Sequence, residues 1–149
     1  METLIELFNL HEIRYLVIGG QAIRLEGFPR FSMDWDVLIP PHDADNIARI
    51  NALLEDELDY PLEPLGPCGE NFIQTYQTRW GILQFHLGAP GLAEFDTLES
   101  RAVERQLSDR IVAKCICGMD LLESKRATHR AADAEDIEFL EAKQQAGLL

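Results

Sequence analysis

Two spacings of hydrophobic residues run through this chain of 149 residues, one typical of helices and one typical of strands. Near the start, Leu4, Leu7 and Phe8 recur at helical spacing, whereas Tyr15–Ile18 is a short apolar run with β-branched residues. In chain order the pattern predicts a helix over Thr3–His11, a strand over Tyr15–Ile18, a helix over Gln21–Glu26, a strand over Asp34–Ile39, a helix from about Asp43 to Leu58, a hairpin of Phe72–Gln77 and Ile82–Leu87, a helix over Phe95–Arg105, a strand over Ile111–Cys117, and two closing helices, the first starting at Gly118.

The stretch from Tyr15 to Pro40 carries the chemistry. Its predicted strand ends in Gly19-Gly20, a helical connector follows, and two carboxylates, Asp34 and Asp36, open the next strand. Because side chains alternate along a strand, the two carboxylates emerge on one face, about 6 to 7 Å apart along the backbone. Mg²⁺ binds one or two carboxylates and fills its remaining positions with water and substrate phosphates. The pair therefore predicts a divalent cation site.

The glycine pair supplies a second part of such a site. Residues without a Cβ let backbone N–H groups approach a phosphate at the N-terminus of a following helix. Taken alone, Gly-Gly is most often a turn, and Asp-x-Asp is most often a solvated face. Here the glycines follow an apolar strand, and 13 residues separate Gly20 from Asp34. This order and spacing favour a nucleotide site over either simpler interpretation.

Composition and charge limit the classes of molecule that the protein is expected to bind. The length suits one domain spanning residues 1–149, and 46% hydrophobic with 26% charged residues is typical of a globular protein. The formal charge of −13 and the lack of a Lys/Arg-rich run disfavour a nucleic-acid acceptor and leave a small-molecule acceptor, a protein or a basic partner open.

The cysteines and the apolar runs bear on the compartment. Three cysteines, Cys68, Cys115 and Cys117, are too few for a disulfide framework, and the Cys-x-Cys pair favours core packing over zinc. The start of the chain has no signal-like segment, and no run is long enough to cross a bilayer. We expect a cytoplasmic protein without a membrane partner.

The motif Arg30-Phe31-Ser32-Met33-Asp34-Trp35-Asp36, placed after strand, Gly-Gly and helix, resembles the nucleotidyltransferase superfamily with a DNA polymerase β-like fold. In particular it resembles a small bacterial branch that includes toxin-type members. The tail from Asp120 to Asp136, with Lys125, Arg130 and Asp133, is similar to the closing segment of that family. The resemblance covers nearly the whole chain.

The resemblance implies an α/β (α+β) fold, with a short mixed sheet and helices packed on it. It also implies transfer of a nucleoside monophosphate from an NTP, assisted by Mg²⁺ or alternatively Mn²⁺. Asp34 and Asp36 would be the catalytic metal ligands, and Gly19 and Gly20 would admit the triphosphate. Arg30 and Lys125 would offset phosphate charge.

Each of the two cations has a structural alternative. Arg30 could pair with an acid near its loop. Lys125 could form an intramolecular ion pair with Asp133 or Asp136. The sequence leaves these alternatives open.

One position departs from the family pattern. In the family, the second strand of this hairpin carries a third carboxylate. At the corresponding position this chain has Gln84. Gln84 offers a carbonyl ligand at best and cannot act as a base. His86, two residues along on the same face, is a possible substitute as base or ligand, although a locally hydrogen-bonded histidine is the more common occurrence.

Two hypotheses of different class follow. One is an active transferase, and the other is a degenerate nucleotidyltransferase fold that serves as a binding or regulatory protein. Membership of a toxin–antitoxin pair follows from analogy alone. Haloacid-dehalogenase-type phosphatases also use Asp-x-Asp, but their nucleophile ends a buried strand, whereas Gly27–Ser32 is loop-like. Glycosyltransferases with Asp-x-Asp need a larger nucleotide-sugar domain than this chain supplies.

Overall fold

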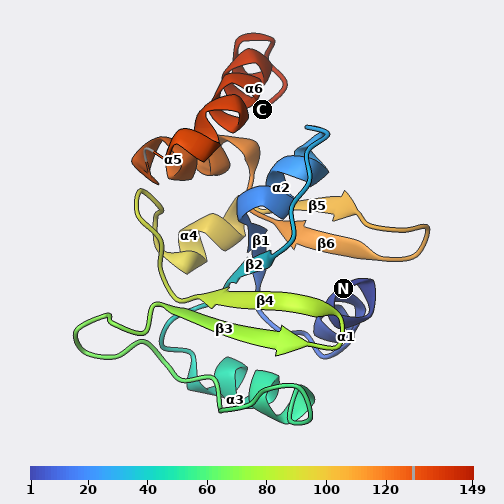
Figure 1. The fold of residues 1–149 in the computed structure, drawn as a ribbon, viewed down its shortest axis with the longest axis vertical. Helices are drawn as coiled ribbons and strands as arrows, with labels where there is room; N and C mark the ends of the chain where they lie inside the picture. The colour runs from blue at the N-terminus through green and yellow to red at the C-terminus, as the bar shows by residue number, and fades with distance from the viewer. Residues whose placement is uncertain (129) are drawn as a thin grey trace.

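The computed structural model describes residues 1–128 and 130–149 and contains a six-stranded mixed sheet with helices around it (Figure 1). The elements are α1 (Glu2–Leu10), β1 (Leu16–Ile18), α2 (Gly19–Glu26), β2 (Trp35–Leu38), α3 (Ala44–Leu53), β3 (Ile73–Thr78), β4 (Gly81–His86), α4 (Phe95–Ser100), β5 (Val103–Gln106), β6 (Val112–Cys115), α5 (Gly118–Thr128), the short 3₁₀ helix η1 (Ala131–Asp133) and α6 (Ala134–Gln145). The predicted α/β fold with a mixed sheet is confirmed.

The strand order is β3-β4-β2-β1-β6-β5. β2 runs parallel to β4 and antiparallel to β1, whereas β1 runs parallel to β6. The register places Asp36 of β2 between Ile18 of β1 and Gln84 of β4, and Thr75 of β3 lies next to Gln84. Directly paired residues share a face of the sheet. Asp36 and Gln84 are therefore side-chain neighbours on one face.

The two faces of the sheet differ. On one face Phe85 of β4 packs near Phe8 of α1, with ring centroids 6.4 Å apart. The opposite face carries Asp36, Gln84 and His86, which are half-buried, and Thr75, which is exposed. The second face is therefore accessible to a ligand over β2, β4 and β3.

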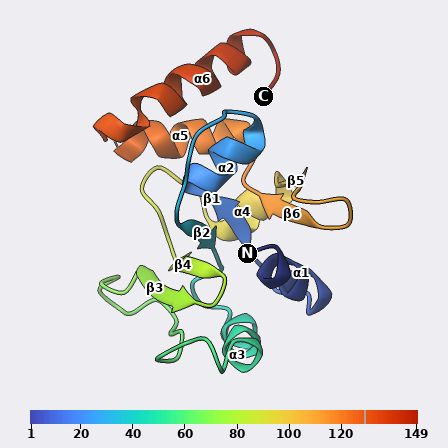
Figure 2. The ribbon, with the colours of Figure 1, turned by 45° about the vertical axis from the view of Figure 1, so that its right-hand side comes forward.

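The C-terminal helices lie at one end of the molecule. Figures 1 and 2 show α5 and α6 side by side there, with α3 at the opposite end. α2 lies between the strands β1 and β2 on one side and α5 on the other. This packing brings the C-terminal segment to the glycine end of β1.

Two predicted helices are shorter than expected. The predicted helix Phe95–Arg105 ends at Ser100, because Val103–Gln106 pairs antiparallel with β6 as an edge strand. The helix predicted to reach Leu58 ends at Leu53. The predicted hairpin is confirmed as β3 and β4. In the case of Val103–Gln106, strand pairing across the turn to β6 overrode the helical spacing.

All three cysteines are free thiols. Cys115 is buried in the core, as its place in a predicted strand suggested. Across the described residues, no helix combines the length and the apolar character that spanning a membrane requires. The cytoplasmic location stays a prediction.

Candidate active site

Gly19 and Asp36 form the centre of the candidate site. Because Ile18 pairs with Asp36, the residue that follows β1 lies directly beside the Asp36 side chain. Gly19 has φ +66°, and a Cβ built on it would lie 2.8 Å from Asp36 Oδ2. An L side chain resists this left-handed backbone and would also displace the carboxylate. Glycine is therefore required here both by conformation and by space.

The start of α2 is equally close to the following loop. A Cβ on Gly20 would lie 2.5 Å from Ser32 Oγ and 3.7 Å from Cζ of Arg30. Gln21, which is buried, donates from Nε2 to the Ser32 carbonyl at 2.9 Å and so holds the loop against the helix. No side chain among the described residues caps α2. Its first N–H groups thus remain available as donors for an anion.

Asp34 lies one residue before β2, in a bend, rather than inside the strand as predicted. Burial still alternates through this segment, since Asp34 and Asp36 are half-buried and Trp35 and Val37 are buried. This alternation places Asp34 and Asp36 on the same side of the backbone. The Asp34 carboxylate forms no ion pair with any residue in the described part of the chain.

His86 contacts the second aspartate. Its Nε2 lies 2.9 Å from Asp36 Oδ1, and both side chains are mostly buried. Asp36 thus uses Oδ1 for the histidine, while Oδ2 lies toward Gly19. Gln84 is the direct register neighbour of Asp36. The structure therefore brings Asp36, Gln84 and His86 together, and the roles of Gln84 and His86 as substitutes for a third carboxylate stay predictions.

Lys125 is not exposed to the candidate site. Its ammonium group is buried and lies 2.8 Å from Asp133 Oδ1 and 3.1 Å from Asp136 Oδ2. Arg30 pairs through Nη1 with the same Asp136. The ion-pair alternatives that the sequence left open are thus present for both cations. A contact of either cation with nucleotide stays a prediction.

The buried Asp133 carboxylate accepts hydrogen bonds from Lys125, Thr128 and Arg130. Burial raises its pKa, but hydrogen bonds from Arg130, Lys125 and Thr128 lower it more, so the net pKa lies well below the ordinary value of 3.8. Arg130 has a raised pKa, chiefly through its hydrogen bonds to Asp133 and, to a smaller degree, through the charge of Asp36. The charge of Arg130 therefore lies close enough to Asp36 for the two to interact.

Two carboxylates fit the needs of Mg²⁺, which fills its other positions with water and phosphate oxygens. Within residues 1–128 and 130–149, no group of three or more His, Cys, Asp or Glu side chains forms a metal site by itself. The donor set of Asp34 and Asp36, with the Gln84 amide nearby, is thus suited to a cation that arrives with a triphosphate. Only glycine at residue 19 leaves the Asp36 carboxylate in its present position.

A cavity of about 600 Å³ opens at the carboxyl ends of the parallel strands β2 and β4, which the antiparallel pairing of β1 and β2 puts at the opposite end of β1 from Gly19. Its walls include Leu38 and Ile39 after Asp36, and Leu87 and Gly88 after His86. The carboxyl ends of neighbouring parallel strands are a common place for ligands in α/β sheets. The cavity is therefore a candidate ligand site that is separate from the contact between Gly19 and Asp36.

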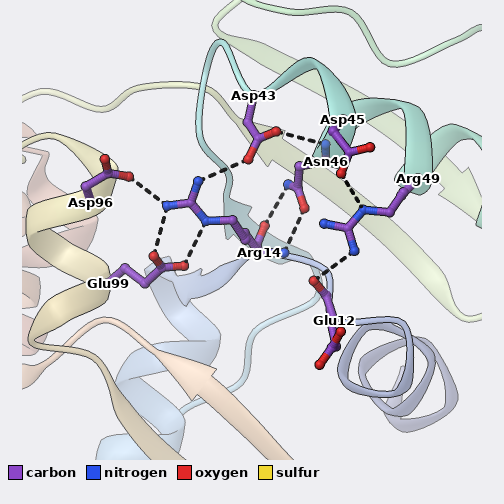
Figure 3. A network of polar contacts seen from close by, with 8 residues as sticks. All are labelled: Glu12, Arg14, Asp43, Asp45, Asn46, Arg49, Asp96 and Glu99. Atoms are coloured by element: carbon purple, nitrogen blue, oxygen red, sulfur yellow. Dashed lines mark hydrogen bonds and ion pairs between the residues drawn. The ribbon is translucent and has the colours of Figure 1, made fainter.

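Arg14 forms one wall of the cavity and joins two helices (Figure 3). Its guanidinium group lies 3.0 Å from Asp43 Oδ2 at the start of α3, and 2.7 Å from Asp96 Oδ1 and 2.9 Å from Glu99 Oε1 on α4. The buried Asn46 accepts from the Arg14 backbone N–H at 2.8 Å and donates to its carbonyl at 3.0 Å. Arg14 is thus fixed at both its backbone and its side chain.

Sequence reasoning did not identify Arg14 or the cavity. Arg14 is 29 residues from Asp43 and 82 residues from Asp96, and no local motif marks it. Arg130 lies within the tail motif, and its spacing to Asp133 could have indicated the ion pair between them. Ser32 also lay within the recognised motif.

Comparisons with known proteins bear on the fold of the chain. No family model matches the sequence, and no curated protein matches it either. The crystal structure of the lincosamide antibiotic adenylyltransferase LnuA, bound to lincomycin, superposes with a TM-score of 0.60 at 18% identity. The match covers 94% of this chain and 93% of that one. The chain has a nucleotidyltransferase fold.

A second similar structure is the solution structure of the antibiotic-resistance factor ANT(2'')-Ia. It has a TM-score of 0.49 at 16% identity and covers 97% of this chain and 91% of that one. Within the nucleotidyltransferase fold of the present chain, the glycine bend, Asp36 and Gln84 meet at one end of β1. The toxin-type branch is not distinguished by these comparisons.

Proposed function

We propose that the protein transfers a nucleoside monophosphate from an NTP to a hydroxyl group of a small-molecule acceptor, with Mg²⁺ as the cofactor. The observation that carries the proposal is the contact between Gly19 and Asp36, where a Cβ would lie 2.8 Å from the carboxylate. A carboxylate and an uncapped helix N-terminus thus meet at one point of a nucleotidyltransferase fold, which supports the proposal.

Asp34 and Asp36 would hold the cation, which would supply charge neutralisation at the phosphates. The N–H groups at the start of α2 would bind the triphosphate between Gly19 and Gly20. Arg30, which is partly exposed above Gly20, and the field of Arg130 would balance further phosphate charge. Lys125 would act through Asp133 and Asp136, by holding these acids and hence Arg30 and Arg130 in place.

The reaction forms a bond from the acceptor oxygen to the α-phosphorus and breaks the bond from that phosphorus to the bridging oxygen. Pyrophosphate leaves with the electron pair of the broken bond. The hydroxyl proton passes to the imidazole of His86, the titratable side chain beside Asp36, and from there to solvent. Gln84 would orient the acceptor or the cation through its carbonyl oxygen.

The test is transfer of label from α-³²P-labelled NTPs, each of the four bases in turn, in the presence of Mg²⁺. Acceptors include lincomycin, because the superposed adenylyltransferase binds it, together with a mixed library of small alcohols. We expect a labelled product with wild-type protein and loss of at least 100-fold with Asp36→Ala. Asp45→Asn, which changes an exposed carboxylate on α3, is the matched control and should leave transfer unchanged.

A second candidate function is a degenerate fold that binds nucleotide without turnover, and Gln84 in the third-carboxylate position favours it. NTP binding without transfer to any acceptor, together with transfer by Gln84→Asp, would support this alternative. The role in a toxin–antitoxin pair stays a prediction from family resemblance. Co-purification with a partner protein would test it.

A further inference from the structure

We propose that the cavity at the carboxyl ends of β2 and β4 is a second ligand site for an organic cation with an apolar body, and that its occupant acts on helix α5 through residues 88–94. This ligand is an effector and not the acceptor of the transfer. Among the described residues, the lining of the cavity includes none of Gly19, Gly20, Asp34 and Asp36. The inference therefore goes beyond the proposed function and does not depend on it.

The cavity has the size and the walls of a small-molecule site. Its volume of about 600 Å³ lies within the range of about 300 to 1,000 Å³ that is usual for such sites. Leu38, Leu87, Leu92 and Phe95 contribute apolar surface to the lining. Because transfer of apolar surface out of water is favourable, these walls favour a ligand with an apolar body.

The charged part of the lining selects a cation. Asp43, Glu94 and Asp96 line the cavity together with Arg14. With His42 neutral, three carboxylates against one guanidinium group leave an excess of two negative charges. Glu94 begins α4 without a side-chain cap bond and forms no ion pair with any residue that the structure describes. Its charge is therefore available to an ammonium group, whereas the excess repels an anion.

Arg14 holds the two acidic walls at a fixed spacing (Figure 3). Its guanidinium group lies 3.0 Å from Asp43 Oδ2, before α3, and 2.7 Å from Asp96 Oδ1 on α4. The backbone N–H of Asn46 lowers the pKa of Asp43 most, and Arg14 lowers it further, so this carboxylate is charged at neutral pH. Because the carboxylates are in place before a ligand enters, less ordering is needed on binding.

Residues 88–94 connect the cavity to α5. Gly88 and Leu92 line the cavity, whereas Gly91 packs against α5, where a Cβ built on it would lie 2.4 Å from Ala127 Cβ. Figures 1 and 2 show this segment, between β4 and α4, reaching toward α5. Two residues before Ala127, Lys125 forms the buried ion pairs of α5. A ligand that contacts Leu92 therefore acts on the packing between Gly91 and α5.

Three probes of similar shape and different charge test the site: 3-phenylpropylammonium, 3-phenylpropanol and 3-phenylpropanoate. The ammonium probe has no hydroxyl group and so cannot be the acceptor of the proposed transfer. Each probe is titrated into the ¹⁵N-labelled full chain, without nucleotide, and followed by amide chemical shifts. We expect the ammonium probe to shift Leu92, Ala93 and Ala127 and to bind at least tenfold more tightly than the propanoate.

Two results of this titration would overturn the inference. Equal or tighter binding of the propanoate, or shifts confined to another surface, would contradict a cation site in the cavity. Shifts at Leu92 and Ala93 that leave Ala127 and the rest of α5 unchanged would contradict the action on α5.

Charge variants make the binding test specific. Glu94→Gln should weaken ammonium binding about two- to fivefold, as expected for a partly exposed ion pair. Ala93→Lys adds an ammonium group to the lining and should weaken binding at least tenfold, whereas Ala93→Met adds similar bulk without charge and should weaken it less than threefold. Asp45→Asn removes an exposed acid of α3 outside the lining and should not change binding. A loss in Asp45→Asn as large as in Glu94→Gln would overturn a local site in favour of a general effect of net charge.

Gly91→Ala tests the connection to α5. Its new Cβ would lie 2.4 Å from Ala127 Cβ, at a residue with φ +74°, so the segment that carries Leu92 must shift relative to α5. We expect ammonium affinity to fall at least threefold. Gly69→Ala is the matched control, because Gly69 has φ +69° with nothing within 4 Å of a new Cβ, and it should bind as wild type does. Unchanged affinity in folded Gly91→Ala would overturn the action on α5.

The transfer assay separates an effector from an acceptor. The ammonium probe should change the rate of transfer without competing with the acceptor, because the two ligands occupy different sites. Competitive inhibition with respect to the acceptor would overturn the effector assignment. The binding tests need no nucleotide, so a lack of transfer from every NTP would overturn the proposed function alone.

Discussion

His86 Nε2 lies 2.9 Å from Asp36 Oδ1, so the histidine two positions after Gln84 contacts the aspartate that Gln84 faces across β2 and β4. The contact fixes the orientation of the Asp36 carboxylate and leaves its second oxygen beside Gly19. Hydrogen bonds to a ligating carboxylate support its geometry around a metal. The strand β4 carries Gln84 where the resembled family has an acid, and through His86 it supplies Asp36 with one polar partner.

Removal of this partner should weaken cation binding. For His86→Ala we expect Mn²⁺ affinity to fall by roughly 10-fold, because an outer partner of a ligating group typically contributes 10- to 100-fold. His86→Gln, which retains a donor, should recover part of the loss. The measurement is a Mn²⁺ titration followed by electron paramagnetic resonance, with His11→Ala as a surface control. Unchanged affinity in His86→Ala would rule out this supporting role.

Gln84→Asp should tighten cation binding. The new carboxylate would stand directly beside Asp36, which supplies a third hard oxygen ligand for a divalent ion. The same change should raise transfer if the wild type is slow because it lacks a third acid. Isothermal titration with Mg²⁺ and the labelled-NTP assay measure the two effects. Weaker Mg²⁺ binding than in wild type would show that Gln84 does not occupy the third-ligand position.

Gly19→Ala should damage the site as well as the fold. Positive φ costs an L residue roughly 1 to 2 kcal/mol, and the new Cβ would also displace Asp36 Oδ2. Gly69→Ala is a matched control, because Gly69 has φ +69° with nothing within 4 Å of a new Cβ. Urea unfolding should show losses in both variants, whereas only Gly19→Ala should reduce Mn²⁺ binding. A similar loss of Mn²⁺ binding in both would refute the contact argument.

Acid should destabilise the fold through Asp133. Its folded-state pKa lies below the ordinary value, so its stabilisation is complete above about pH 4 and is lost as the pH falls toward the folded pKa. Asp133→Asn should lower the free energy of unfolding by about 3 kcal/mol at pH 7, since it breaks a buried ion pair. Its further decline between pH 4 and pH 2 should then be shallower than that of wild type.

Urea titrations at pH 7, 5, 3 and 2 measure these slopes. Thr128→Val removes one hydrogen bond to Asp133 and should act in the same direction with a smaller effect. Asp45→Asn, on an exposed carboxylate, should stay within about 0.5 kcal/mol of wild type at each pH. Parallel slopes for wild type and Asp133→Asn would show that the acid response arises elsewhere.

The parts of the site that the sequence predicted are those held by neighbouring positions in the chain or by strand register. Gly19 and Gly20 follow β1 directly, and Asp34 and Asp36 come at the start of β2 after one connector, so order and spacing were sufficient to predict their positions, whereas their roles stay predictions. Gln84 could be placed because the hairpin was visible as two apolar runs. In the register of β2 and β4, Gln84 pairs directly with Asp36.

The remaining features depend on packing between distant segments. Whether Lys125 faced a ligand or an acid was undetermined until α5, η1 and α6 were placed, because both outcomes use the same residues. The strand β5 was mistaken for helix because its pairing partner lies beyond a turn, in β6. The Arg14 cavity needs three segments to meet, which no local spacing encodes.

The most direct measurement is a crystal structure with Mn²⁺ and a non-hydrolysable NTP, in which anomalous scattering locates the metal. The account predicts Mn²⁺ within ligand distance of both Asp34 and Asp36, with the triphosphate along Gly19-Gly20 at the start of α2. Metal and triphosphate bound away from these residues, or neither bound at saturating concentration in folded protein, would contradict it.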